Sequence, residues 1–175
     1  MPSPTKTLIM TTDHPTTTNR DDAFVRAFLA GCAKDKGFAA RMRRADNPAT
    51  EYQSWDFLAR FNVQLENPFQ RLPHTTIVAA MARTKATKNG TLSLGKALAA
   101  CYSDGNENKQ AIAKLRRVLA CSELSELCRV LRPVLALINS RVTQPLDFVR
   151  LLQQLRNFGF DDTAIKSQWA QEFFA

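Results

Sequence analysis

The first helical pattern in the chain is Asn19–Asp35, with the sequence NRDDAFVRAFLAGCAKD. Phe24, Phe28 and Cys32 follow one another at intervals of four residues, which places them on one face of an α-helix. Leu29 lies beside them, so the face is apolar along its length. Beyond this segment the apolar residues keep a helical spacing, and the alternating pattern of a half-buried strand is nowhere sustained. The sequence therefore predicts an all-α fold.

Turn and cap signals divide the chain into eight or nine helices. Ser122, Thr143 and Asp161 can accept hydrogen bonds from the free N–H groups of a helix start, and prolines end helices or open them. Pro133 is expected to kink or split a long helix, at a cost of about 3 kcal/mol. We expect helices near residues 19–35, 38–44, 52–63, 73–83, 93–102, 107–120, 122–140, 144–157 and 161–173.

The turn at Ser103–Asn106 is the clearest break in the chain. It predicts two small helical bundles packed together, residues 20–103 and residues 104–175. Residues 1–19 contain three prolines and a cluster of threonines, a composition that buries too little apolar surface to offset the entropy of ordering. They are therefore expected to form a disordered tail.

The overall composition is that of a basic globular protein. The chain of 175 residues carries 24 Lys and Arg against 16 Asp and Glu, a net charge of +8. The four cysteines form neither a CxxC pair nor an evenly spaced framework, which is typical of the reducing cytoplasm. We find no apolar run of membrane-spanning length and no secretory signal, so a cytoplasmic protein is expected.

The charge is concentrated between Arg71 and Arg117, where nine cations accompany only two acids, Asp104 and Glu107. Like charges repel over a Debye length of about 8 to 10 Å, so this imbalance favours an anionic partner. The run has one aromatic residue, Tyr102, whereas base stacking would use several. The predicted mode is therefore contact with nucleic-acid phosphates, with weak sequence preference and strong salt dependence.

Candidate contact residues come from clusters of cations. The clusters at residues 41–44, 85–88 and 114–117 have no acid at the i,i+4 positions that would neutralise them on a helix. A single Lys or Arg usually only solvates a helix, but three such clusters indicate an anion. The candidate nucleic-acid-binding residues are Arg41, Arg43, Arg44, Lys85, Lys88, Lys96, Lys114, Arg116, Arg117 and Arg132.

Catalytic and metal chemistry find little support. Cys121 and Cys128 would lie about 10 Å apart on a continuous helix, too far to share a zinc ion, so both are expected in the core. His74 is expected near a helix start, in a capping or surface role, without a partner for nucleophilic catalysis. The pairs Asp21-Asp22 and Asp161-Asp162 are better explained as helix caps than as magnesium ligands. We therefore expect no enzyme, no metal site and no cofactor.

The block Ser93–Ala99, SLGKALA, is the most distinctive motif of the chain. By itself, Gly95 in this block is better explained by close helix packing than by contact with phosphate. The block fits the pattern S-L-G-[KR]-A-L-A, and it occurs in order with four further segments: Met42–Pro48, Glu66–Pro68, residues 115–137 and Leu155–Gly159. Together these segments resemble the CasB family, the small subunit of the type I-E CRISPR Cascade complex. The resemblance spans about residues 24–174.

The resemblance implies a non-catalytic helical subunit of an RNA-guided antiviral complex. It implies two copies arranged head to tail, beside the CasA subunit, the CasC backbone and the crRNA. In that family basic surfaces hold the crRNA-paired target DNA and the displaced non-target strand, and so stabilise the R-loop. Modest protein contacts can do this because exchanging a DNA duplex for a heteroduplex is nearly balanced in energy.

The resemblance also assigns some of the candidate residues by motif position. Arg43 and Arg44 match the basic pair after the first helix, and Lys96 matches the basic residue after the glycine. Arg41, Lys85 and Lys88 rest on charge clustering alone. The remaining four fall in the basic tract of the second half: Lys114, Arg116, Arg117 and Arg132.

The chain departs from the family pattern in two places, the Thr-rich segment before residue 20 and Phe158, where a tryptophan pair is common before the glycine. The second departure affects only local packing. The alternative function from the residues alone is a helical protein–protein scaffold whose cations are merely solvated. A metal-dependent nuclease is disfavoured because the acids are scattered.

Overall fold

The computed structural model describes residues 17–175, and side chains from Arg20 onward. Within that part of the chain there are nine α-helices and three short 3₁₀ helices, so the all-α prediction is confirmed. The α-helices are α1 (Thr17–Lys34), α2 (Lys36–Met42), α3 (Trp55–Arg60), α4 (Pro68–Met81), α5 (Leu94–Ala100), α6 (Lys109–Leu119), α7 (Leu124–Arg141), α8 (Phe148–Asn157) and α9 (Asp162–Phe174). The 3₁₀ helices are η1 (Arg43–Asp46), η2 (Glu51–Ser54) and η3 (Gly105–Glu107). Residues 1–16 of the expected tail lie outside the described residues. Residues 17–19, which were assigned to the same tail, belong to α1.

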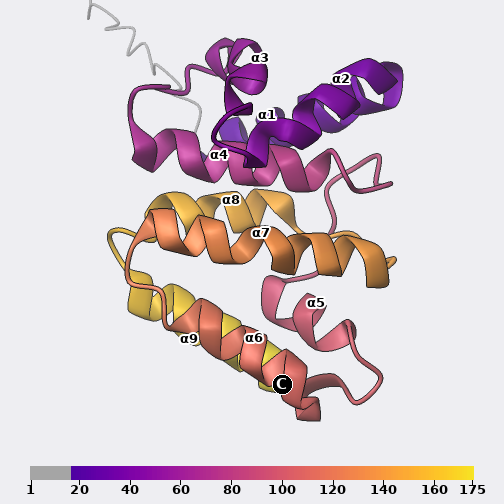
Figure 1. Cartoon of the computed structure of the whole chain (residues 1–175), viewed down its shortest axis with the longest axis vertical. Coiled ribbons are helices and arrows are strands. Elements are labelled where there is room, and N and C mark those ends of the chain that lie inside the picture. Colours follow the sequence, from indigo (N-terminus) through magenta and orange to yellow (C-terminus); the bar gives the residue numbers. More distant parts are fainter. Residues whose placement is uncertain (1–16) are drawn as a thin grey trace, which may run out of the picture.

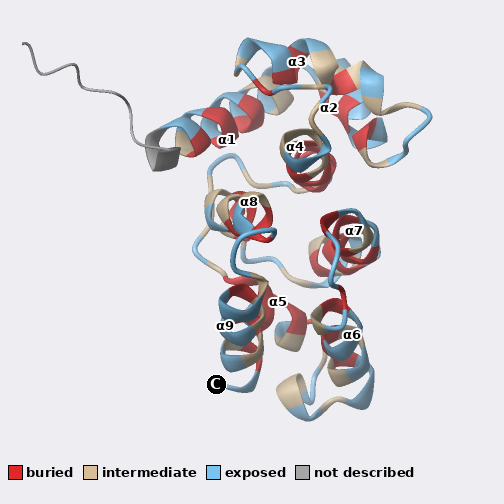
Figure 2. Ribbon diagram, turned by 90° about the vertical axis from the view of Figure 1, so that its left-hand side faces the viewer, coloured by how far each residue is buried: buried red, intermediate tan, exposed pale blue. Residues whose placement is uncertain are grey.

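The helices form three layers along the long axis of the molecule (Figure 1). α1 to α4 lie at one end, α7 and α8 in the middle, and α5, α6 and α9 at the other end. α4 packs on both α7 and α8, while α5 packs on α9. Figure 2 shows buried residues on the facing sides of these helices. The division of the chain into two bundles at residues 103–104 stays a prediction.

An aromatic cluster fills the core of the first layer. Phe24 and Phe28 on α1 both contact Phe57 on α3, with ring centroids 5.4 and 5.3 Å apart. Phe38 and Phe61 complete the cluster from α2 and from the turn after α3. Tilted and edge-to-face pairs at these distances are the favoured arrangements of aromatic rings. The apolar stripe expected on the first helix therefore anchors α1, α2 and α3 to one another.

α4 begins five residues before its expected start at residue 73. Asn67 caps the helix by accepting a hydrogen bond from the Phe69 N–H, and Pro68 occupies the first turn, where a missing N–H has no cost. Pro73 consequently lies inside α4 and leaves one carbonyl without its helical partner.

This shift also overturns the prediction for His74. His74 is neither a cap nor a surface residue, because it lies on the buried part of α4 with 6% of its surface exposed. Its Nδ1 atom is 2.6 Å from the carbonyl oxygen of Gln70, and its ring stands edge-on to Phe24. The pKa of His74 is lowered to about 4, mainly by burial; the hydrogen bond to the Gln70 carbonyl opposes this change, and the nearby charge of Arg156 adds to it.

Two other expectations about helices are corrected. Pro133 does not split α7, which is a single helix from Leu124 to Arg141, and of the two expected effects the kink stays a prediction. Cys121 lies before the start of α7, so it does not share a helical face with Cys128, although both are buried as expected. No helix in the described part of the chain is long and apolar enough to cross a membrane.

Two glycines, Gly90 and Gly95, permit close backbone contacts in and before α5. A Cβ atom on Gly95 would lie 2.3 Å from the carbonyl oxygen of Trp169 on α9, so the α5–α9 contact requires glycine. A Cβ on Gly90 would lie 1.9 Å from the carbonyl oxygen of Pro145. There the segment before α5 pairs with the segment before α8 through one parallel bridge, Leu92 to Leu146. Gly95 therefore serves helix packing, as expected.

Candidate nucleic-acid interface

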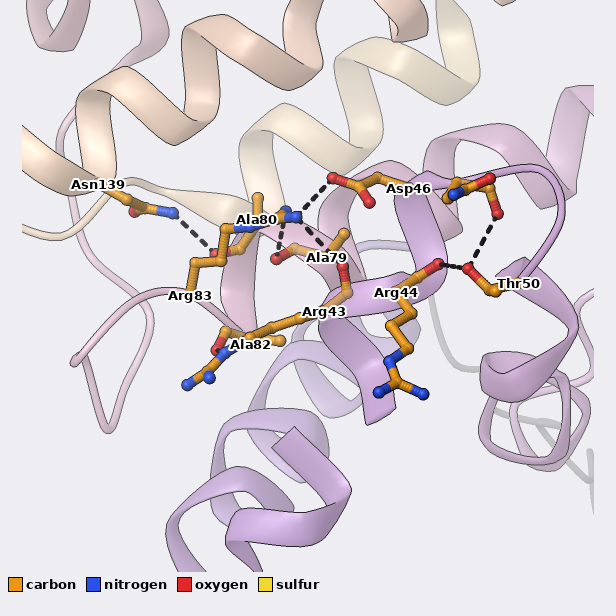
Figure 3. Close-up of polar contacts among 10 residues, drawn as sticks. Arg43, Arg44, Asp46, Thr50, Ala79, Ala80, Ala82, Arg83 and Asn139 are labelled. Carbon is orange, nitrogen blue, oxygen red and sulfur yellow. Dashed lines mark hydrogen bonds and ion pairs between the residues drawn. The ribbon is translucent and has the colours of Figure 1, made fainter. Parts of the chain in front are cut away.

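The end of α4 organises the first group of candidate cations. The last carbonyl groups of a helix have no partner within the helix, and here side chains from elsewhere supply it (Figure 3). Arg83 donates to Ala79, Asn139 to Ala80 and Arg43 to Ala82, at 3.2, 2.9 and 3.0 Å. Arginines at this end also complement the negative end of the helix dipole. Arg43 is thus held at a fixed position by its Nε atom.

Two cations of the basic run are already neutralised. Arg83 forms an ion pair with Asp46 at 2.7 Å, and it also donates to the carbonyl of Arg43 (Figure 3). Arg71 pairs with Glu51 at 3.1 Å. Both acids lie upstream of the run, on η1 and η2, so a count of charges along the sequence could not include them. The run from Arg71 to Arg117 is therefore less one-sided in the folded protein than in the sequence.

A hollow of about 490 Å³ beside Arg43 brings together three cations. Lys36 comes from the start of α2, Arg43 from η1 and Lys85 from the loop after α4. None of them forms an ion pair with a described residue, and no acidic side chain lines the hollow. Thr84 and Thr87 add hydroxyl groups to its wall. Such a concave, uncompensated positive site is suited to a phosphate group.

The hollow contains one thiol, Cys32. Burial raises the pKa of Cys32 to about 11, although the positive charge of Arg43 opposes the change. Because the thiolate is the reactive form, Cys32 is a poor nucleophile here. The thiol therefore adds no negative charge to the three cations that line the hollow.

The remaining members of the 41–44 cluster differ in their surroundings. Arg41 is paired with Asp56 on α3 at 3.2 Å and lies over the ring of Phe38, so the expectation of an unpaired cluster is wrong for this residue. The acid is 15 positions away in sequence and beyond any helical i,i+4 search. The side chain of Arg44 is exposed and forms no ion pair with a described residue (Figure 3).

Lys88 and Lys96 are both exposed, and neither has an acidic partner among the described residues. Lys88 lies in the loop between α4 and α5, as the sequence predicted. Lys96 lies on α5 next to Gly95, and Gly95 faces α9. The packing of α5 on α9 therefore leaves the Lys96 side chain exposed to solvent.

A second group of cations lies between α6 and α7. Lys114 and Arg117 border a groove of about 270 Å³, which has a floor of Val130, Val134 and Leu137. Arg116 is exposed on α6. The aliphatic stems of Lys and Arg pack well on such a floor while their charged ends remain in water.

Arg132 on α7 is half-buried, and its Nε atom is buried without a hydrogen-bond partner among the described residues. A buried donor of this kind is costly unless it finds a partner. Arg132 does not line the groove of Lys114 and Arg117, although its helix α7 supplies the floor of that groove.

Two groups of candidates therefore lie on different elements, Arg43 and Lys85 at the hollow and Lys114, Arg116 and Arg117 on α6, and the other candidates belong to neither group. Figure 1 places α2 in the layer at one end of the long axis and α6 in the layer at the other. Sequence reasoning missed Lys36, because this residue is isolated in the sequence and joins Arg43 and Lys85 only when α2 packs beside the loop after α4. Within the described residues no group of His, Cys, Asp or Glu has the geometry to hold a metal ion.

Comparison with known proteins relates the chain to one family and to solved structures. The family model described as CRISPR-associated protein Cse2 matches residues 39–174. The crystal structure of M. ruber CasB has the same fold, with a TM-score of 0.69 and 24% sequence identity. That match covers 89% of this chain and 92% of the M. ruber chain. No curated protein sequence matches the chain. The family match includes every candidate cation from Arg41 to Arg132, whereas Lys36 lies just outside it.

Proposed function

The chain belongs to the Cse2 family, the CasB small subunits of the type I-E Cascade, and from this premise we propose that it holds DNA in the R-loop through its free cations. In this function it is a non-catalytic subunit. Its Lys and Arg side chains contact phosphates of the target strand and of the displaced non-target strand. The contacts are to the backbone, so they tolerate any target sequence.

The observation that carries the proposal is the hollow lined by Lys36, Arg43 and Lys85. Three cations from three elements converge there without a carboxylate to neutralise them. Keeping like charges together has an electrostatic cost that an anion removes. A nucleic-acid backbone supplies such anions at regular spacing, and the groove at Lys114 and Arg117 can contact the same polymer further along.

The partners in this proposal are those of the family. The chain would lie beside CasA and the CasC backbone in two copies arranged head to tail, against the crRNA and its paired DNA. Co-expression with the neighbouring genes tests this part directly. Copurification of the chain with a guide-RNA complex is expected, and recovery of the free chain alone would contradict it.

The DNA contact can be measured with the purified chain. We expect binding of duplex and single-stranded DNA by fluorescence anisotropy, with an affinity that falls steeply as salt rises. Each phosphate contact contributes about −0.9 to the slope of log K against log salt on duplex DNA. Neutralising Lys36 and Lys85 together should therefore make the slope shallower by about two.

A matched control is Arg26→Ala, which also removes a positive charge but at a residue already paired with Asp22 on the same helix. Arg26→Ala should leave the slope almost unchanged. If Arg26→Ala and Lys85→Ala weaken binding equally, the effect is one of net charge, and the hollow is not the contact.

The alternative function is a protein–protein scaffold, and it is favoured by one observation: several candidate or neighbouring cations are engaged in the fold itself. Arg41, Arg71 and Arg83 all form ion pairs. Charge reversal at Lys36 and Lys85 separates the two functions within the assembled complex. A scaffold would still assemble and still hold an R-loop, whereas a DNA-contacting subunit would assemble and hold it poorly.

A further inference from the structure

A second polar pocket lies away from the proposed DNA contacts. It has a volume of about 380 Å³ and is enclosed by the start of α1, the turn after α3, the middle of α4 and the end of α8. No residue lines both this pocket and the hollow beside Arg43. The two sites are therefore distinct.

Three arginines and one acid line the pocket. Arg156 is engaged, since it binds the buried carboxylate of Asp21 at 2.7 Å. Arg20 and Arg60 form no ion pair with a described residue. The pocket thus keeps an excess of two positive charges on guanidinium groups, which match the oxygen atoms of a phosphate or carboxylate.

His74 supplies the group that distinguishes one anion from another. Its Nδ1 atom lies against the carbonyl of Gln70, and a carbonyl only accepts, so Nδ1 carries the proton. In the neutral ring Nε2 is then an acceptor, and no described residue donates to it. This acceptor belongs to a pocket that two free arginines also line, and the combination calls for a ligand with both negative charge and an exchangeable proton.

We propose that this pocket binds a phosphomonoester group, with Arg20 and Arg60 on the anionic oxygens and His74 sharing the remaining proton through Nε2. A monoester has a second ionisation near pH 6 and so can bring a P–OH proton. An internal phosphodiester has no such proton, and a carboxylate bound as an anion has none either. This step rests on the proposed function: because the chain is proposed to lie against nucleic acid, the monoester is that of a free nucleotide or of the phosphorylated end of a strand.

The charged groups around His74 favour this assignment. Arg156 on α8 approaches the ring and disfavours an imidazolium, while Asp21 on α1 is neutralised by that same arginine. Arg20 and Arg60 complete the charged lining. A bound dianion would reverse this balance and hold one proton between itself and Nε2. Binding should therefore take up a proton, and the affinity should fall at least tenfold between pH 6 and pH 8.

The test is an NMR titration of the imidazole signals of the full chain, which has only two histidines, His14 and His74. The probes are thymidine 5′-monophosphate and a thymidine dinucleotide whose only phosphate is an internal diester. We expect saturable shifts of the His74 signals with the monophosphate, stronger binding at pH 6 than at pH 8, and no comparable binding of the dinucleotide. Equal affinity for the two probes, equal affinity at the two pH values, or an unmoved His74 would overturn the proposal.

Variants test the residues without disturbing the core. Arg60→Ala changes an exposed side chain and should weaken monophosphate binding at least tenfold. Arg129→Ala, an exposed arginine on α7 outside the pocket, should have no effect, and an equal loss in both variants would contradict a specific site. Duplex binding through Lys36 and Lys85 should survive Arg60→Ala, so the failure of either proposal is recognised separately.

The two sources of the phosphate are distinguished by a third probe, a single strand with or without a 5′-phosphate. Tighter binding of the phosphorylated strand than of the mononucleotide, detected at His74, assigns the pocket to a strand end. Binding of the mononucleotide alone assigns it to a free nucleotide.

Discussion

At the scale of single residues, two positions matter most. Gly95 has no room for a Cβ atom, and His74 has a lowered pKa. The backbone of α9 approaches so closely that the missing Cβ is a condition of the α5–α9 contact. The close packing of α5 on α9 thus explains the glycine in the family motif. The adjacent Lys96 is exposed to solvent.

Gly95→Ala should destabilise the protein by about 3 kcal/mol or more, because the added methyl group meets backbone atoms that cannot yield. Chemical denaturation measures the loss. Gly159→Ala is the matched control, since its Cβ would meet only Phe69, at an ordinary 3.9 Å. A Gly95→Ala variant as stable as the control would contradict the close contact.

His74 predicts how stability changes with pH. Its pKa is lowered to about 4 in the folded protein and is about 6.5 in the unfolded chain. The contribution is therefore complete above pH 6.5 and is lost as the pH falls toward 4, with a loss of about 2 kcal/mol by pH 5. Denaturation of the wild type at pH 7 and pH 5 measures it. In His74→Gln the difference between the two pH values should shrink by that amount, and an unchanged difference would rule out His74 as the source.

At the scale of elements, helix ends are satisfied by residues far away in the sequence. Asp147 caps α8, as an acid at a helix start should. Asn89 assists from the loop after α4, because its Oδ1 atom accepts from the N–H of Phe148 at 2.8 Å and its Nδ2 atom donates to Asp147. Periodicity along the chain indicated only a basic loop at this position.

Asn89→Ala should therefore destabilise the protein by about 1 to 2 kcal/mol, because it removes a capping acceptor and a donor to Asp147 together. Hydrogen exchange should locate the loss at the first turn of α8. The control Asn157→Ala, at an exposed position at the other end of the same helix, should change stability by less than about 0.5 kcal/mol. Equal effects would show that the Asn89 contacts contribute nothing.

At the scale of the whole molecule, the two groups of cations are separated along the long axis. The hollow lies in the layer of α2, and the groove lies between α6 and α7, where the middle layer meets the layer at the other end (Figure 1). In the proposed function, a long nucleic acid that follows the molecule would contact both groups at once, whereas a short one would occupy either.

This separation predicts a dependence on DNA length. On a duplex of about 6 base pairs, roughly 20 Å long, Lys85→Ala or Arg117→Ala alone should cost little, and only the double variant should bind poorly. On a duplex of about 30 base pairs each single variant should weaken binding. Anisotropy with the two duplexes measures this, and single variants that behave alike at both lengths would mean that the groups act as one site.

The sequence by itself determined the helical class, most helix positions, the basic character and the family. These are encoded by neighbours three or four positions apart, by composition and by a local motif. It misplaced the start of α4, because Asn67 and Pro68 can end one helix or open the next. The sequence favoured a packing role for Gly95, but it could not reveal that an added Cβ atom would meet the backbone of α9.

Only the tertiary structure decided which charges are free. Arg41 and Arg83 find acids on other elements, and the pair of Arg156 with Asp21 joins residues 135 positions apart. Lys36 meets Arg43 and Lys85, and the His74 side chain becomes buried, only after the helices pack. The physical reason is that an ion pair or a desolvated ring depends on distance in space, which sequence patterns of local period do not contain.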